Sequence, residues 1–179
     1  MASIEGSDHT EKAELEEIMS TEIAKSLIAE AERQNQPSVI GQVLNNRRQP
    51  LRLLASTSWT GSFFTAPPNV GGAGEFIRFS HNGSKGAVIY GQAPGSSNAA
   101  AYLLAWSMER IPRNRKVYAK CGPISEVHYN GWERAALTSL DSSGFNSSDK
   151  HDGTSSSVVA RIVDATGSFP LGAVLANFN

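Results

Sequence analysis

A change of hydrophobic period at Pro37 divides the sequence into two parts that fold differently. Before Pro37, apolar residues recur about every four positions and therefore share one face of an α-helix. They are Leu15, Ile18, Met19, Ile23, Leu27, Ile28 and Ala31. We predict one amphipathic helix over residues 10–34 with Thr10 as its N-cap, and we expect it to end before Pro37, because the residue preceding a proline avoids the α region.

After Pro37, short runs of β-branched, aromatic and aliphatic residues alternate with turn residues. The runs lie at 38–45, 51–64, 75–81, 86–91, 99–108, 116–121, 157–164 and 170–178. Strands at this spacing favour an antiparallel sandwich or barrel over a parallel α/β sheet. A buried helix remains an alternative for 99–108, because periodicity does not decide a short apolar run.

The segments between these runs carry their own expectations. The Asn82-Gly83 pair predicts a hairpin at 81–86. The polar stretch 141–157 predicts a long loop, and a turn at 165–168 is expected to join the last two strands.

One short helix should interrupt the strands, at 130–140. Asn130 is its expected cap, and Trp132, Ala136 and Leu140 fall on one face. The fold class predicted is therefore mainly β, with residues 1–36 forming an acidic tail and helix and residues 37–179 forming a β-sandwich domain.

Charge is distributed unevenly between the two parts. Residues 1–34 hold nine acidic and three basic residues, a net charge of −6, whereas residues 35–179 hold eight acidic and thirteen basic residues, a net charge of +5. Helices that lie in a membrane interface usually carry basic polar faces. We therefore expect the acidic helix to lie against the sandwich or a partner, and pairing of residues 10–34 between copies would give a homo-oligomer.

The opening residues MASIEGSDHTEK have neither a basic n-region nor an apolar h-region. No run approaches the roughly 18 apolar residues that a transmembrane helix needs. We expect a cytoplasmic protein, with a nuclear or a peripheral membrane location as alternatives. The single cysteine, Cys121, excludes an internal disulfide and a cysteine-based zinc site.

Residues suited to catalysis are few. The four histidines, His9, His81, His128 and His151, match no recognised metal-binding spacing. The chain also lacks a G-x-S-x-G elbow and a phosphate-binding G-x-x-x-x-G-K-[ST] loop. We predict a non-enzymatic protein without a metal or cofactor. A hydrolase with a dispersed Ser-His-Asp triad stays open, because triad members need not be close in sequence.

Two basic clusters lie in predicted loops and could meet the phosphate of a lipid headgroup. One consists of Arg47, Arg48 and Arg52, and the other of Arg110, Arg113, Arg115 and Lys116. Solvated charge, or a surface on which the acidic helix docks, is the simpler interpretation. Nucleic-acid binding is not expected, since the isoelectric point is about 6.4 and no RNP or zinc-finger motif is present.

Aromatic residues at element ends are candidates for a membrane interface or for stacking on a sugar. Trp59, Tyr129 and Trp132 occupy such positions, whereas Trp106 lies inside an apolar run and is expected in the core.

A series of short motifs from residue 38 to residue 179 resembles a known family. The motifs are SWTG (58–61), FIRFSH (76–81), GSKGAVIY (83–90), YLLAWS (102–107), KVYAK (116–120) and VHYNGW (127–132), followed by a Ser/Gly loop and two closing strands. In this order they resemble the plant jasmonate-induced proteins and their fungal lipid-binding relatives of the nakanori type.

The resemblance implies an actinoporin-like β-sandwich and a non-enzymatic plant protein of the stress response. In such sandwiches, aromatic and polar groups at one end hold a phosphocholine headgroup. The candidates here, by residue type and location, are Tyr90, Tyr118, Tyr129, Trp132, Arg113 and Arg115, with a lipid headgroup or a glycan as the expected ligand. The acidic N-terminal helix departs from the inserting segment of pore-forming members and argues against pore formation.

Overall fold

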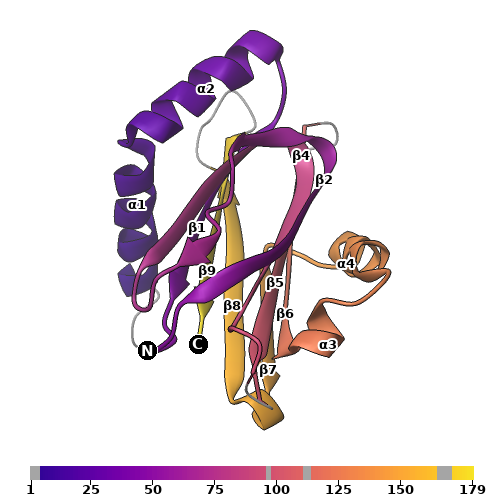
Figure 1. Cartoon of the computed structure of the whole chain (residues 1–179). Helices are drawn as coiled ribbons and strands as arrows, with labels where there is room; N and C mark the ends of the chain where they lie inside the picture. The colour runs from indigo at the N-terminus through magenta and orange to yellow at the C-terminus, as the bar shows by residue number, and fades with distance from the viewer. Residues whose placement is uncertain (1–4, 96–97, 111–113, 165–170) are drawn as a thin grey trace.

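The computed structural model, which describes residues 5–95, 98–110, 114–164 and 171–179, has two facing sheets with helices on both outer sides (Figure 1). Its helices are α1 (Glu5–Met19), α2 (Glu22–Gln34), α3 (Ile124–Val127), α4 (Trp132–Asp141) and the short 3-10 helix η1 (Asp152–Thr154). Its strands are β1 (Ser38–Asn45), β2 (Leu51–Thr65), β3 (Val70–Gly71), β4 (Phe76–Gly91), β5 (Ala100–Glu109), β6 (Asn114–Pro123), β7 (Asn146–His151), β8 (Ser156–Asp164) and β9 (Leu171–Phe178).

Strand β4 belongs to both sheets. Its first half pairs with β1, its second half pairs with β5, and β2 pairs with it along most of its length. One sheet continues from β1 to β9, β8 and β7, and the other from β5 to β6. Among the described strands, every pair is antiparallel except β1 with β9. The mainly β, antiparallel fold predicted from the sequence is confirmed.

A kink between Asn82 and Lys85 lets β4 pass from one sheet to the other. The predicted hairpin at 81–86 is wrong, because the Asn82-Gly83 pair lies in an irregular step of one continuous strand. Gly83 has φ +143°, and a Cβ there would lie 2.2 Å from the carbonyl oxygen of Thr60 on β2. Gly61 sits opposite with φ +77°, and its Cβ would lie 1.9 Å from the carbonyl oxygen of Asn82. Two glycines thus allow the close approach of both strands at the kink.

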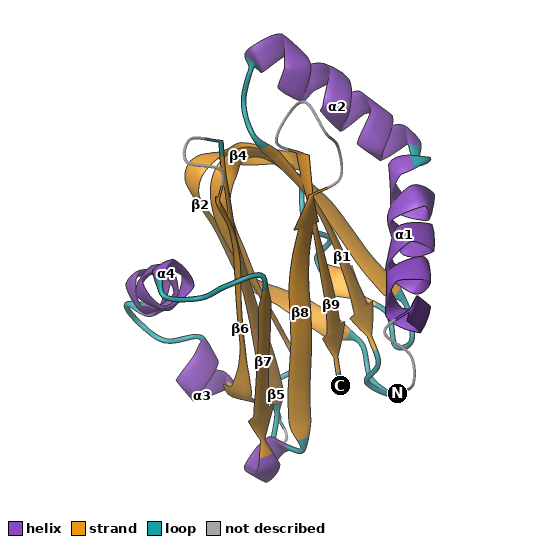
Figure 2. Ribbon diagram, turned by 180° about the vertical axis from the view of Figure 1, so that it is seen from behind, coloured by secondary structure: helices purple, strands orange, loops and turns teal. Residues whose placement is uncertain are grey.

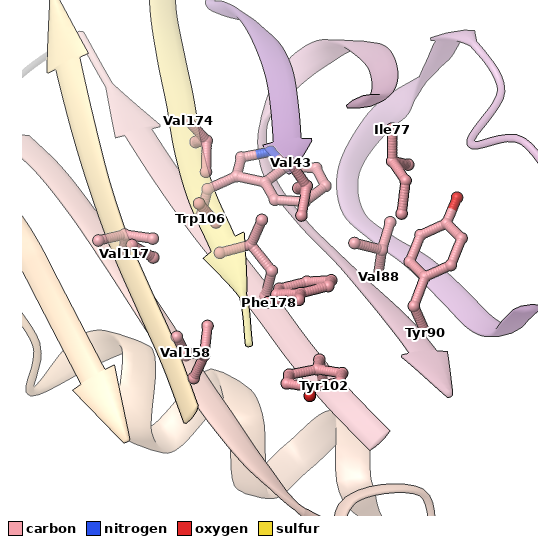
Figure 3. Close-up of a cluster of buried hydrophobic side chains, with 14 of the residues drawn as sticks. Val43, Ile77, Val88, Tyr90, Tyr102, Trp106, Val117, Val158, Val174 and Phe178 are labelled. Atoms are coloured by element: carbon pink, nitrogen blue, oxygen red, sulfur yellow. The ribbon is translucent and has the colours of Figure 1, made fainter. Parts of the chain in front are cut away.

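The main core fills the space between the sheets. Alternate residues of β5 point inward, so Tyr102, Leu104 and Trp106 share one buried cluster with Val174 and Phe178 of β9. Figure 3 shows Tyr102, Trp106, Val174 and Phe178 in this cluster. The Tyr102 and Phe178 rings stack with centroids 4.6 Å apart. Trp106 lies in the core as expected, and the extended β5 excludes the helix considered for 99–108.

Hydrogen bonds from β6 to β7 and to Gly144, two residues before β7, close one side of the sandwich. The backbone N–H groups of Ala119 and Cys121 donate to the Ser147 Oγ and Asp149 Oδ2 atoms, each at 3.0 Å, and Val117 N–H donates to the Gly144 carbonyl at 2.9 Å. The continuous loop predicted at 141–157 is wrong, because this segment contains β7 and η1.

Helices α1 and α2 cover the outer face of β1 and β9 (Figure 2). Ala24 and Leu27 are fully buried there against Ile40 and Leu175. The single helix predicted over 10–34 is wrong in two respects. Helix α1 already begins at Glu5, so Thr10 lies inside it and is not its N-cap, and the helical conformation is interrupted between Met19 and Glu22.

The break comes from Thr21. Its hydroxyl donates to the Ile18 carbonyl at 2.8 Å and accepts the Ala24 N–H at 3.2 Å, and these side-chain bonds replace the helical backbone pattern. No helix of the described residues is long and apolar enough to cross a membrane.

Helix α4 covers the outer face of the other sheet. Trp132, Ala136 and Leu140 are buried on Ile89, Leu103 and their neighbours, which confirms the predicted helix and its apolar face. The predicted cap is wrong, because the N-cap residue is Gly131 and not Asn130. The predicted turn at 165–168 lies outside the described residues.

Candidate functional site

The turn between α3 and α4 surrounds an open hollow of about 640 Å³. Seven consecutive residues line it: His128, Tyr129, Asn130, Gly131, Trp132, Glu133 and Arg134. Pro123 ends β6 and starts α3, and Gly131 then reverses the chain with φ +91°, a value that suits glycine. The hollow is therefore built on a short turn between two helices that pack on the sheet.

Two aromatic residues define the hollow. Trp132 is anchored, with 7% of its surface exposed, whereas Tyr129 is 42% exposed. The His128 and Trp132 rings meet edge to face, with centroids 6.4 Å apart, and the backbone N–H of Trp132 donates to the Tyr129 carbonyl at 3.1 Å. An anchored ring beside an accessible ring offers a surface on which a sugar or a quaternary ammonium group can pack.

The charged groups of the hollow have opposite signs. Glu133 and Arg134 are both exposed, and they follow each other in the first turn of α4. Gly131 offers no side chain to cap this turn, so the backbone N–H groups that follow Trp132, at the positive end of the helix, carry no side-chain cap and can meet a ligand. The hollow therefore suits a ligand that carries a positive and a negative charge together, or a ligand without charge.

The structure separates the other residues proposed from the sequence. Tyr90 is fully buried in the main core, where its hydroxyl donates to the Pro68 carbonyl at 2.6 Å and burial raises its pKa. Tyr118 is partly buried beside the cluster under α4. Arg115 lies over the exposed Phe145 ring at 4.9 Å, and Arg113 lies outside the described residues. Of the six candidates, the structure brings Tyr129 and Trp132 together in the hollow.

The sequence did not point to the other four side chains that line the hollow. His128, Asn130, Glu133 and Arg134 belong to the same HYNGWER segment. Their proximity to Tyr129 in the sequence, together with a glycine before a helix, is the pattern that could have identified them.

A serine and a histidine also meet, at the kink between β2 and β4. The His81 Nε2 atom lies 3.0 Å from Ser58 Oγ, and its Nδ1 atom lies 3.3 Å from the Gly83 carbonyl oxygen. His81 is fully buried beside Phe63 and Trp106, and burial lowers its pKa to about 4. A base with so low a pKa is a poor activator of serine. In addition, a carbonyl oxygen orients this histidine, whereas a catalytic triad uses a carboxylate.

Comparisons with known proteins place the fold. No protein-family model and no curated protein matches the chain. Among solved structures, the lipid-binding protein nakanori superposes with a TM-score of 0.67 at 18% identity, over 84% of this chain and 76% of nakanori. A lectin from Xerocomus chrysenteron superposes with a TM-score of 0.47 at 13% identity, over 80% of this chain and 99% of the lectin.

The chain therefore has a nakanori-like fold. The motifs in the sequence resemble two groups of proteins, and the resemblance to the nakanori type is confirmed for the fold. Membership of the plant jasmonate-induced family stays a prediction that rests on the motifs in residues 38–179.

Proposed function

We propose that this protein is a non-enzymatic binding protein that holds a polar headgroup, of a lipid or a similar ligand, in the hollow between α3 and α4. The observation that carries the proposal is the exposed Tyr129 ring beside the anchored Trp132 ring, with charges of both signs next to them.

The charge pattern favours a zwitterionic headgroup such as phosphocholine. A quaternary ammonium group can pack on the Tyr129 ring and lie near Glu133, since aromatic faces attract cations. The phosphate of the same headgroup can lie near Arg134 and the N–H groups that begin α4. A neutral sugar that stacks on Tyr129 is the alternative ligand, because stacking needs no charge.

The nakanori-like fold supports this proposal, because nakanori is itself a lipid-binding protein. Assembly through residues 10–34 is a weaker candidate. Ile18 and Leu27 of that stretch are buried in the cluster on this chain's own sheet and are not available to a partner.

The motif resemblance adds a biological setting to the proposal. We propose a plant protein induced by jasmonate or stress that acts in the cytoplasm or at the surface of a membrane. Measurement of its transcript and of its distribution between soluble and membrane fractions, before and after jasmonate treatment, tests this setting.

Co-sedimentation with vesicles tests the ligand. Vesicles of phosphatidylcholine, phosphatidylethanolamine and phosphatidylserine are compared, with immobilised neutral glycans tested in parallel. Preferential binding to phosphatidylcholine is expected. Binding to the glycans alone selects the sugar alternative, and a failure to bind any member of the panel contradicts the proposed function.

A further inference from the structure

A second hollow, of about 360 Å³, lies where the β1–β2 loop meets Gln92 and Asn179. It is lined by Asn46, Arg47, Arg48, Gln49, Gln92 and Asn179. These are two guanidinium groups and four amides, without an acidic side chain among the described lining residues. Such a set of donors suits an oxyanion.

The buried side chain of Asn45 holds the loop that forms this hollow. Its Nδ2 atom donates to the carbonyls of Gln49, Gly71 and Gly72 at 3.0–3.2 Å, and its Oδ1 atom accepts the Arg47 N–H at 3.0 Å. Asn45 is fully buried, so the loop is tied to the segment around β3 before any ligand arrives. A loop fixed in this way loses little conformational entropy on binding.

The other polar groups around Arg48 are already held by hydrogen bonds within the chain. Arg47 Nη1 donates to the Ser155 carbonyl at 2.8 Å. Gln92 is 8% exposed; its Oε1 atom accepts the Ala100 N–H at 2.8 Å, and its Nε2 atom faces Gln49 Oε1 at 3.4 Å. The main-chain oxygen of Asn179 is occupied by the Tyr102 hydroxyl at 2.6 Å and the Ser157 N–H at 2.9 Å.

Arg48 stands apart from its neighbours. It is exposed, and no described residue forms a hydrogen bond or ion pair with it. Its planar guanidinium can therefore form a bidentate contact with an incoming oxyanion at no cost to an existing pair.

We propose that this hollow binds a phosphate group, with Arg48 as the direct ligand and Arg47 and Gln92 as the fixed wall. The site is separate from the hollow at Tyr129 and does not depend on the proposed headgroup function. The phosphate belongs either to a soluble phosphate ester or to an anionic lipid.

Titration of the full chain with inorganic phosphate at constant ionic strength, followed by amide NMR shifts, tests the site. Saturable shifts are expected at Arg48, Gln49 and Gln92. Arg48→Gln should weaken binding about tenfold, the loss expected for one charged hydrogen-bonding pair. Lys25→Gln on α2 changes the net charge equally, at an exposed lysine outside the hollow, and should leave the affinity unchanged.

Vesicles of phosphatidylcholine with and without phosphatidic acid separate the two sources. Additional binding that appears when phosphatidic acid is included, and that is lost in Arg48→Gln, supports a lipid phosphate. Shifts with free phosphate and no gain from phosphatidic acid support a soluble ester. Two results overturn the proposal: no saturable shift and no dependence on phosphatidic acid in the unaltered chain, or equal weakening by Arg48→Gln and Lys25→Gln.

Discussion

The Nη2 atom of Arg161 on β8 lies 2.7 Å from the Oε2 atom of Glu14 on α1. This ion pair joins the acidic N-terminal segment to the basic sandwich. Both side chains are about one-third exposed, at 36% and 32%, so water screens the pair and its contribution to stability is small. Helix attachment therefore depends mainly on apolar contact, above all on the fully buried Leu27.

A first prediction compares these two contacts. Leu27→Ala should lower the free energy of unfolding by about 3 kcal/mol, because it removes buried methyl groups and leaves a cavity. Arg161→Gln should lower it by less than about 1 kcal/mol. Urea unfolding at low and high salt measures both, and we expect little dependence on salt. A larger loss for Arg161→Gln than for Leu27→Ala would show that the attachment is electrostatic.

A second prediction concerns pH and His81. Burial lowers the pKa of this histidine to about 4, whereas an unfolded histidine has a pKa near 6.5. Between these values the unfolded chain binds a proton that the folded chain does not. The free energy of unfolding should therefore fall as the pH drops from 6.5 to 4, by about 3 kcal/mol from this residue alone.

The control for this prediction is His81→Gln, which removes the titrating group at the same position. Chemical unfolding at several pH values between 7 and 5 gives the slope for both proteins. The slope should be flatter in the variant. Equal slopes would mean that His81 does not set the response to acid.

A third prediction concerns the kink in β4. Gly83→Ala places a Cβ within 2.2 Å of the Thr60 carbonyl oxygen, at a backbone conformation that alanine avoids, and should cost about 3 kcal/mol or more. Gly144→Ala is the matched control, because an added Cβ there meets no atom within 4 Å. Thermal unfolding compares the two variants. Similar melting temperatures would contradict the role assigned to Gly83.

A fourth prediction addresses the hydrolase alternative. The Ser58–His81 pair should not react with a fluorophosphonate probe, since the weak base and the buried ring give poor activation. Mass spectrometry of the treated protein measures labelling. A label that appears on Ser58 and disappears in His81→Gln would establish an activated serine.

The sequence predicted elements well where apolar side chains reach a core. Strand β1 falls on the predicted residues 38–45, and the face of α4 with Trp132 and Leu140 is buried as expected. Strand β7 was missed because its inward side chains, Ser147 and Asp149, bond to the backbone of β6 and fill no apolar space. Hydrophobic alternation gives no indication of such a strand.

The candidate site was predictable only in part. Tyr129 and Trp132 could be proposed because a turn before a helix exposes the first ring and anchors the second. Tyr90 points into the core because of the kink at Asn82–Lys85, which changes the face of the sheet on which the later side chains of β4 lie. That shift comes from the contact between Gly61 and Gly83 of different strands, which no local pattern reveals.

Binding of phosphatidylcholine vesicles by Tyr129→Ala tests the central claim most directly. The matched control is Phe64→Ala, which removes an equally accessible ring on β2: Phe64 is 44% exposed and Tyr129 is 42% exposed. Loss of one stacking ring should weaken vesicle binding about tenfold in Tyr129→Ala and leave it unchanged in Phe64→Ala. Unchanged binding by Tyr129→Ala, or equal loss in both variants, would contradict a headgroup site between α3 and α4.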